Sequence, residues 1–194
     1  MRSLAITLVL ASFVLALPAA SSAQGYLVPN FGWDYGGTAG NCPSLWTDCQ
    51  EKRMSYGVTF GKIGGIFGIE GDLGYAPDFF GESPTHGTNS LLTFMGNLVV
   101  AIPAGPVRPY AEAGLGLIRT RVDLLLQPAD GSDTNANNFG YNFGGGVMFL
   151  LPAHLGFRGD IRYFRTFSDI SILGVALGKT PISYTRFSIG LVIH

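Results

Sequence analysis

The chain has 194 residues, of which 13% are charged, and its formal net charge of −1 falls near −2 once residues 1–23 are removed. This weak balance argues against a nucleic-acid partner, which would favour a basic face. The chain is hydrophobic, yet no segment after residue 23 has an apolar run long enough for a membrane-spanning helix. Two classes remain: a soluble β protein, or a barrel whose apolar residues face lipid.

The first 23 residues have the pattern of a secretory signal peptide. Arg2 supplies a positive start, residues 4–17 are apolar, and small residues follow up to Ala23. The apolar run is about 14 residues, shorter than the roughly 20 that an α-helix needs to cross a bilayer. We therefore predict cleavage between Ala23 and Gln24, which leaves one exported domain at 24–194. A retained N-terminal anchor is the alternative.

After Gln24, segments of about ten residues with alternating character are separated by turn residues, a rhythm typical of outer-membrane barrel strands. No convincing amphipathic helix interrupts it. The pattern predicts an all-β fold, an eight-stranded antiparallel up-and-down transmembrane β-barrel. The predicted strands are 25–35, 53–62, 66–75, 90–102, 108–120, 139–151, 155–167 and 181–193.

The predicted connections alternate in length. The second, fourth and sixth, at 63–65, 103–107 and 152–154, are tight, whereas the other four run for a dozen residues or more. Short periplasmic turns and longer extracellular loops would give this alternation and would place both termini in the periplasm. A soluble sandwich has no reason to alternate so regularly.

The two cysteines, Cys42 and Cys49, lie seven positions apart in the first long connection. Outside the cytoplasm, a pair this close most simply closes a local disulfide. Two free thiols or pairing between chains are the alternatives, and two ligands alone make a poor zinc site. The polar stretch 127–138 lacks the spacing of a recognised calcium loop, so we expect neither a metal nor a cofactor.

Apolar and polar side chains alternate along the predicted strands. In 66–75, Phe67 and Ile69 share one face, while Glu70 and Asp72 share the other. About eight strands enclose an interior only just wide enough for side chains, so a face rich in Phe, Tyr, Leu and Ile would not fit inside. The apolar face is therefore predicted to point outward into lipid, and the charged and glycine-rich face inward.

The polar residues at the inward-facing positions of the strands predict a polar network in the lumen. Charges in so narrow a space are costly unless they pair, so a structural network is favoured over a conducting pore. Acid–base catalysis by Glu70 and Asp72 is a remote alternative, because a sealed lumen offers no substrate access. The predicted members are Glu70, Asp72, Asn97, Glu112, Asn142, Arg158, Asp160, Arg162 and Arg186.

Three segments carry a family resemblance: residues 67–75, 97–116 and 144–163. In this order they are similar to the third strand, the central hairpin and the penultimate strand pair of the small outer-membrane barrel family that includes opacity proteins, OmpX and the OmpA barrel. The resemblance implies a plugged interior, insertion by the barrel-assembly machinery and residence in the outer membrane of a Gram-negative-type bacterium. The last strand departs from the family pattern, because the chain stops at His194, one residue short of the usual final aromatic.

An enzymatic alternative lies at the outer rim. The segment His86-Gly87-Thr88-Asn89 loosely resembles the His-x-Ser-Asn of lipid A deacylases, and Asp123 lies at the outer end of the next predicted strand. A hydroxyl nucleophile needs a base and an orienting acid, roles that His86 and Asp123 would fill for Thr88. That family uses Ser rather than Thr, so a polar loop is favoured over a catalytic set.

Three arginines fall on outward-facing positions of the alternating pattern, at the predicted extracellular ends of their strands: Arg119, Arg121 and Arg165. Arginine there could pair with lipopolysaccharide phosphates through bidentate hydrogen bonds. Ordinary solvated rim charge is the alternative interpretation, and the sequence favours neither.

These features together predict a monomeric, non-enzymatic, integral outer-membrane barrel surrounded by outer-membrane lipids and lipopolysaccharide. A rigid barrel would hold its long loops outside the cell, so we expect a structural or adhesin-like role in which the loops contact an extracellular ligand. The alternatives are an outer-membrane lipid A-modifying hydrolase and a small passive pore.

Overall fold

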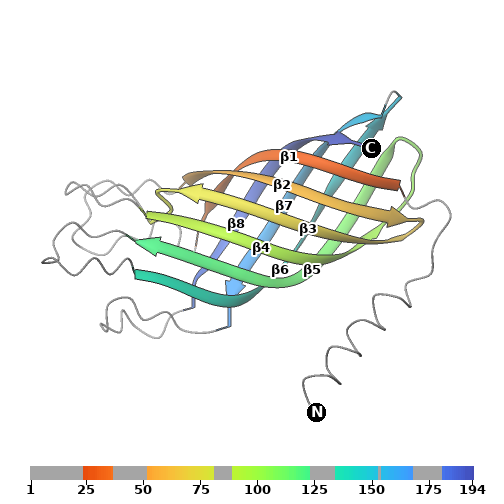
Figure 1. Ribbon diagram of the computed structural model, residues 1–194. Helices are drawn as coiled ribbons and strands as arrows, with labels where there is room; N and C mark the ends of the chain where they lie inside the picture. Colours follow the sequence, from red (N-terminus) through yellow and green to blue (C-terminus); the bar gives the residue numbers. More distant parts are fainter. Residues whose placement is uncertain (1–23, 37–51, 81–88, 123–133, 153, 168–180) are drawn as a thin grey trace, which may run out of the picture.

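Eight antiparallel strands close into one barrel, with each strand paired to its neighbours in chain order (Figure 1). The computed structural model describes residues 24–36, 52–80, 89–122, 134–152, 154–167 and 181–194. The strands are β1 (Gln24–Tyr35), β2 (Lys52–Gly64), β3 (Phe67–Pro77), β4 (Asn89–Ala101), β5 (Val107–Val122), β6 (Thr134–Leu151), β7 (Leu155–Thr166) and β8 (Ser183–Ile193). The predicted fold class is therefore confirmed, with all eight strands present.

No helix among the described residues is long and apolar enough to cross a membrane. The predicted signal peptide, residues 1–23, lies outside the described residues, and Gln24 is the first residue of β1.

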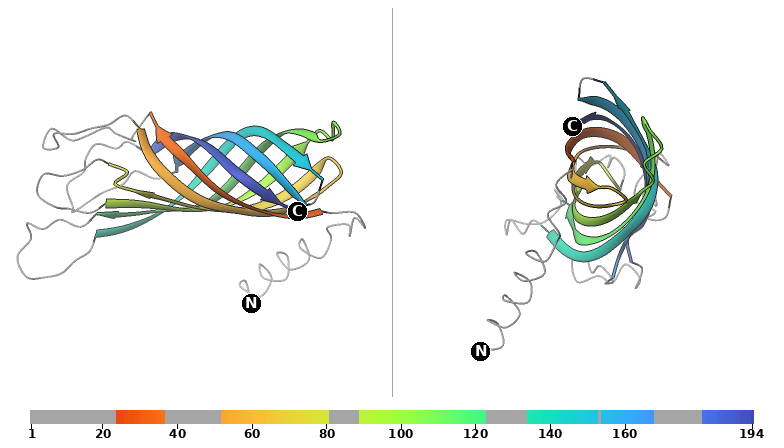
Figure 2. Two further views of the ribbon diagram at one scale, coloured as in Figure 1. Left: turned by 90° about the horizontal axis from the view of Figure 1, so that it is seen from above. Right: turned by 90° about the vertical axis from the view of Figure 1, so that its right-hand side faces the viewer.

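The register of the strands fixes their tilt. Following paired residues once around the barrel from Gly25 leads back to Tyr35, ten residues further along β1. Such a stagger requires strands inclined to the barrel axis, typically by about 35–45°. The slanted strands are visible in the left view of Figure 2.

The two ends of the barrel differ. The connections β2–β3, β4–β5 and β6–β7 are short, and Gln24 and Ile193 lie at the same end as these turns. We call this the short-turn end and the opposite one the long-loop end. Gly65 and Gly105 have positive φ angles of 68° and 67°, a conformation that glycine adopts without steric cost, so the turns can be tight.

The hairpin of β5 and β6 is longer than the sequence pattern predicts. β6 begins at Thr134 rather than at 139, and residues Thr134–Asn138 pair with Ile118–Val122 of β5. Asn and Asp are disfavoured in strands, which is why this stretch resembles a loop in the sequence. Ladder pairing with β5 overrides that local preference.

The alternation of side chains gives the barrel two distinct faces. Large apolar side chains dominate the outer face, where Phe67 is 71% exposed and Leu98 is 70% exposed. Every Asp and Glu within the eight strands is buried on the inner face: Asp34, Glu70, Asp72, Glu112 and Asp160. The structure thus has the apolar outer face and the charged inner face that the alternation of side chains and the lumen volume predict.

Candidate functional site

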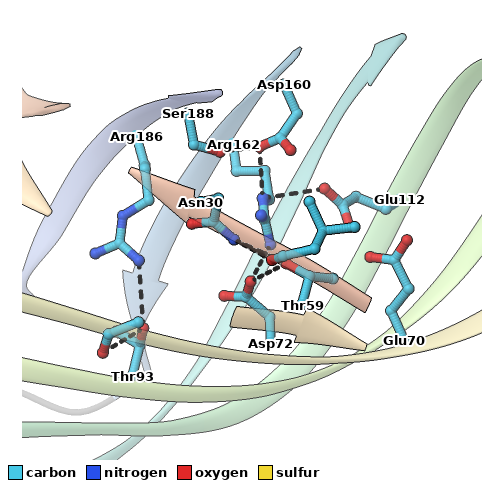
Figure 3. Close-up of polar contacts among 12 residues, drawn as sticks. Asn30, Thr59, Glu70, Asp72, Thr93, Glu112, Asp160, Arg162, Arg186 and Ser188 are labelled. Carbon is cyan, nitrogen blue, oxygen red and sulfur yellow. Dashed lines mark hydrogen bonds and ion pairs between the residues drawn. The ribbon is translucent and has the colours of Figure 1, made fainter. Parts of the chain in front are cut away.

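The lumen is built from three layers of side chains. An apolar layer at the long-loop end contains Ala76, Phe79, Leu91, Met95, Ile118, Phe164, Ile182 and Tyr184. A second apolar layer, at the short-turn end, contains Tyr26, Val28, Ile63, Val99, Ala101, Tyr110, Met148 and Val192. Ion pairs and hydrogen bonds fill the space between them (Figure 3).

Arg158 of β7 is one centre of the polar layer. Its Nη1 and Nη2 atoms hold the two carboxylate oxygens of Glu70 at 2.7 and 3.1 Å, and its Nε lies 2.9 Å from Asp160 Oδ2. Glu112 is further away, with its two oxygens 3.5 Å from Arg158 Nη2. The guanidinium also lies 4.5 Å from the ring centre of Tyr110, a cation–π distance.

Arg162, one inward position further along β7 from Asp160, is the second centre. Its Nε lies 2.9 Å from Asp160 Oδ1 and 3.1 Å from Glu112 Oε1, and its Nη1 lies 3.1 Å from Asp72 Oδ2 (Figure 3). Asp160 therefore bridges the two arginines, and one connected network joins β3, β5 and β7 across the lumen.

Hydroxyl groups complete this network from the remaining sides. Ser188 Oγ donates to Asp160 Oδ1 at 2.8 Å, and Thr59 Oγ1 donates to Asp72 Oδ2 at 2.8 Å. Tyr110 donates to Asp160 Oδ2 at 3.1 Å, and the Tyr26 hydroxyl donates to Glu70. Both tyrosines belong to the apolar layer at the short-turn end, so that layer is hydrogen-bonded to the polar one.

A separate pair lies toward the long-loop end. Arg186 of β8 holds Asp34 of β1 through two hydrogen bonds, Nε to Oδ1 at 2.6 Å and Nη2 to Oδ2 at 2.8 Å. Its guanidinium lies 5.2 Å from the ring centre of Phe164 and 5.6 Å from that of Tyr184. This pair joins the first and last strands, at the position where the barrel closes.

Asn97 and Asn142 face inward on either side of Gly114, as register partners in β4 and β6. They are 4% and 1% exposed, and neither side-chain amide has a hydrogen-bond partner among the described residues. Of the nine lumen residues predicted from sequence, the structure joins the seven charged ones in polar contacts and leaves these two outside them.

The sequence interpretation missed several contributors to the lumen. Asp34 could have been found, because it shares inward parity with Asn30 in β1. The alternation in β8 places Ser188 on the inward face beside Arg186, but it predicts no hydrogen bond for the hydroxyl, and the uncharged donor Thr59 carries no distinct signal. The inward apolar side chains of the two end layers, such as Met95 and Phe164, were also missed, because the alternation predicts an inner face of charged residues and glycine alone.

At the outer rim, the three predicted arginines are exposed on the outward face near the long-loop end. Arg119 and Arg121 belong to β5, and Arg165 belongs to β7. The other predicted site residues lie outside the described residues: Cys42, Cys49, His86, Thr88, Asp123 and Ala23. Within the described residues, no group of three or more His, Cys, Asp or Glu side chains could hold a metal ion.

The outer-membrane protein beta-barrel domain family matches residues 5–194 of the chain. No curated protein matches it in sequence. Neisserial surface protein A, NspA, is similar in structure, with a TM-score of 0.63 and 18% identity over 89% of this chain and 98% of that one.

Two further solved structures are also similar. A major outer membrane protein from Thermus thermophilus has a TM-score of 0.52 and 12% identity, over 88% of this chain and 99% of that one. Ail of Yersinia pestis, in complex with the heparin analogue sucrose octasulfate, has a TM-score of 0.50 and 12% identity, with 88% and 99% covered. At these identities the structures establish the fold alone. The family match covers nearly the whole chain, and we conclude that the protein belongs to the outer-membrane protein beta-barrel domain family.

Proposed function

We propose that this protein is a monomeric, non-enzymatic outer-membrane barrel with a plugged lumen, whose specific contacts are made at the long-loop end. The three-layer lumen carries this proposal. Arg158 and Arg162 are 2% and 1% exposed, and both are held by carboxylates between two apolar layers. An interior of this kind stabilises a scaffold and gives ions no continuous polar path.

The geometry also supports an orientation. Short connections and both strand termini share one end, as in outer-membrane barrels with periplasmic turns and longer extracellular loops. We therefore infer that the long-loop end faces the outside of a Gram-negative-type cell and the short-turn end faces the periplasm.

A surface-interaction role is supported by the fold neighbours and by general principles. NspA is named a surface protein, and Ail, an attachment protein, was solved with a heparin analogue. Loops held by a rigid scaffold are the usual sites of binding. We propose the adhesin-like role by analogy with these proteins.

Single-channel recording in a planar lipid bilayer tests the plugged lumen. We expect the full-length protein, extracted from outer membranes in its folded form, to give no steady conductance under conditions in which a general porin conducts. A steady conductance, seen in every insertion, would contradict the proposal and establish the small-pore alternative.

Protease treatment of intact cells tests the orientation. Trypsin should cleave the protein at Lys179, in the last long connection, and should spare Lys62 near the short-turn end of β2. Permeabilised cells show whether Lys62 can be cleaved at all. Cleavage at Lys62 but not at Lys179 in intact cells would reverse the proposed orientation.

Lipid A mass spectra test the absence of enzymatic activity. Outer membranes that contain the protein should show the same lipid A acylation as membranes without it. Loss of an acyl chain that depends on His86 or Thr88 would instead establish the hydrolase alternative.

A further inference from the structure

The basic residues of the outer face are distributed unevenly. Among the described strand residues, five Lys or Arg side chains are exposed on this face, and only Lys62 lies near the short-turn end. Every carboxylate of the eight strands faces the lumen, so the outer surface of the strands carries cations but no Asp or Glu. The four cations toward the long-loop end are Lys52, Arg119, Arg121 and Arg165.

Depth in the membrane gives this distribution a meaning. A Lys or Arg on the lipid face of a barrel is strongly destabilising at the bilayer midplane and nearly neutral near the interfaces. Arg119, Arg121 and Arg165 lie close to the ends of β5 and β7, beyond the apolar side chains of the same strands. They are therefore placed at headgroup depth.

Arg119 and Arg165 lie on either side of β6. Arg119 pairs with Asn137 of β6, and Arg165 pairs with Tyr141 of the same strand. Four residues along the strand and two strand spacings put their Cα atoms about 16 Å apart. Paired residues shift by ten residues toward the long-loop end in one circuit of the eight strands. The partner of Arg165 in β6 lies four residues nearer the short-turn end than the partner of Arg119, so the shift between β5 and β7 offsets part of this difference. The two arginines therefore lie at similar depth in the membrane.

An aromatic cluster adjoins Arg165 on the outward face of β6 and β7. The ring centres of Tyr141 and Phe167 are 5.3 Å apart, those of Tyr141 and Phe143 6.4 Å, and those of Phe143 and Tyr163 5.4 Å. Phe143 is 53% exposed and Phe167 is 61% exposed. The cluster is an apolar platform directly beside a cationic group.

We propose that the outer face of β5, β6 and β7 at the long-loop end binds a phosphorylated glycolipid of the outer leaflet. The Arg119 and Arg165 guanidiniums hold its phosphate groups, because a planar guanidinium forms paired hydrogen bonds with phosphate oxygens. Phe143 and Tyr163, which lie on the short-turn side of Arg165, contact the acyl chains below the headgroup. The assignment to the outer leaflet rests on the orientation given under Proposed function.

The position of the arginines favours a lipid over a soluble anion. They extend from the strands, on the face that meets lipid, and Arg165 adjoins aromatic rings that a hydrated sulfated glycan would not contact. Neither Arg119 nor Arg165 forms an ion pair among the described residues. A lipid that carries both phosphate groups and acyl chains matches the arginines and the neighbouring aromatic rings.

Native mass spectrometry of the folded full-length protein in a non-ionic detergent tests the proposal. The probes are lipid A with two phosphates and the same lipid A after enzymatic dephosphorylation. We expect the wild type to bind the phosphorylated lipid at least about tenfold more tightly than the dephosphorylated one, and we expect this preference to weaken with added salt. Equal affinity for the two lipids would overturn the proposal.

Variants locate the site. The double substitution R119A/R165A should abolish this preference, and R119K/R165K should keep part of it because charge remains while the paired hydrogen bonds are lost. The matched control K52A/K62A removes two exposed cations from β2 and should keep the preference in full. Heat-modifiable gel migration verifies that each variant is folded.

Two outcomes overturn the proposal even where lipid binding is seen: an unchanged preference in R119A/R165A, and displacement of lipid A by a heparin oligosaccharide at equal concentration. The second would assign the arginines to a sulfated glycan. Because binding is measured in detergent, it does not depend on orientation. A failure of the proposed orientation would appear only in the protease experiment on intact cells.

Discussion

The inner and outer faces of this barrel are made by alternate residues of the same strands, yet they treat charge in opposite ways. Inside, Arg158 and Asp160 are buried and held in a fixed network. Outside, Arg119 and Arg165 are exposed at one end and have no ion-pair partner among the described residues. Polar groups that are buried in a low dielectric must be matched locally, whereas exposed cations at the membrane edge remain available for a ligand.

The largest expected difference between the two faces is the cost of removing one arginine. R158A would leave Glu70 buried without the arginine that holds both its oxygens, and Asp160 would keep only Arg162. The loss of one partner in a buried ion pair typically costs about 3–5 kcal/mol. R119A should change the free energy of unfolding by less than about 0.5 kcal/mol, as exposed substitutions usually do. Urea unfolding of the folded barrels in detergent micelles measures both, and equal costs would contradict the comparison.

The second prediction concerns the pair that joins β1 to β8. D34A leaves the buried Arg186 guanidinium without its carboxylate and should destabilise the barrel by about 3 kcal/mol. The double variant D34L/R186L removes both charges and should cost less than D34A alone, because no unpaired charge remains buried. A double variant that costs the sum of the single substitutions would show that the two side chains are not coupled.

The third prediction compares the packing around a lumen glycine with that around a glycine of the outer face. In G114A, the added Cβ would overlap the Asn97 amide oxygen and the Gly96 carbonyl oxygen, so this lumen substitution should cost about 1–3 kcal/mol through overpacking. Gly159 lies on the outward face of β7, where a Cβ meets no atom within 4 Å. G159A should therefore be neutral or slightly stabilising in the same unfolding assay. If the two substitutions had the same effect, the tight lumen would not be the cause.

Much of this organisation could be predicted because the strand period of two separates the faces. The alternation of side chains, the barrel volume and the signal peptide together assign Glu70, Asp72 and Arg158 to the lumen. The pairing of individual side chains was not predictable, because it depends on register: Arg158 reaches Glu70 across the lumen, 88 positions away in the chain. Asn135 and Asn137 show the converse, since their membership of β6 depends on pairing with β5 rather than on their own propensity.

The smallest predicted effect tests whether every buried polar side chain in the lumen stabilises the barrel. The side-chain amides of Asn97 and Asn142 are buried and have no hydrogen-bond partner among the described residues. Leaving such a group unsatisfied costs about 1–3 kcal/mol, so the near-isosteric N97L should stabilise the barrel by about 1 kcal/mol. N30L is the control, because the Asn30 amide donates to Val28 O and Thr59 Oγ1, each at 3.2 Å, and its loss should destabilise. Destabilisation by N97L of the same size as by N30L would mean that the Asn97 amide is satisfied in the folded protein. The polar layer would then extend from the six connected charged residues to this amide.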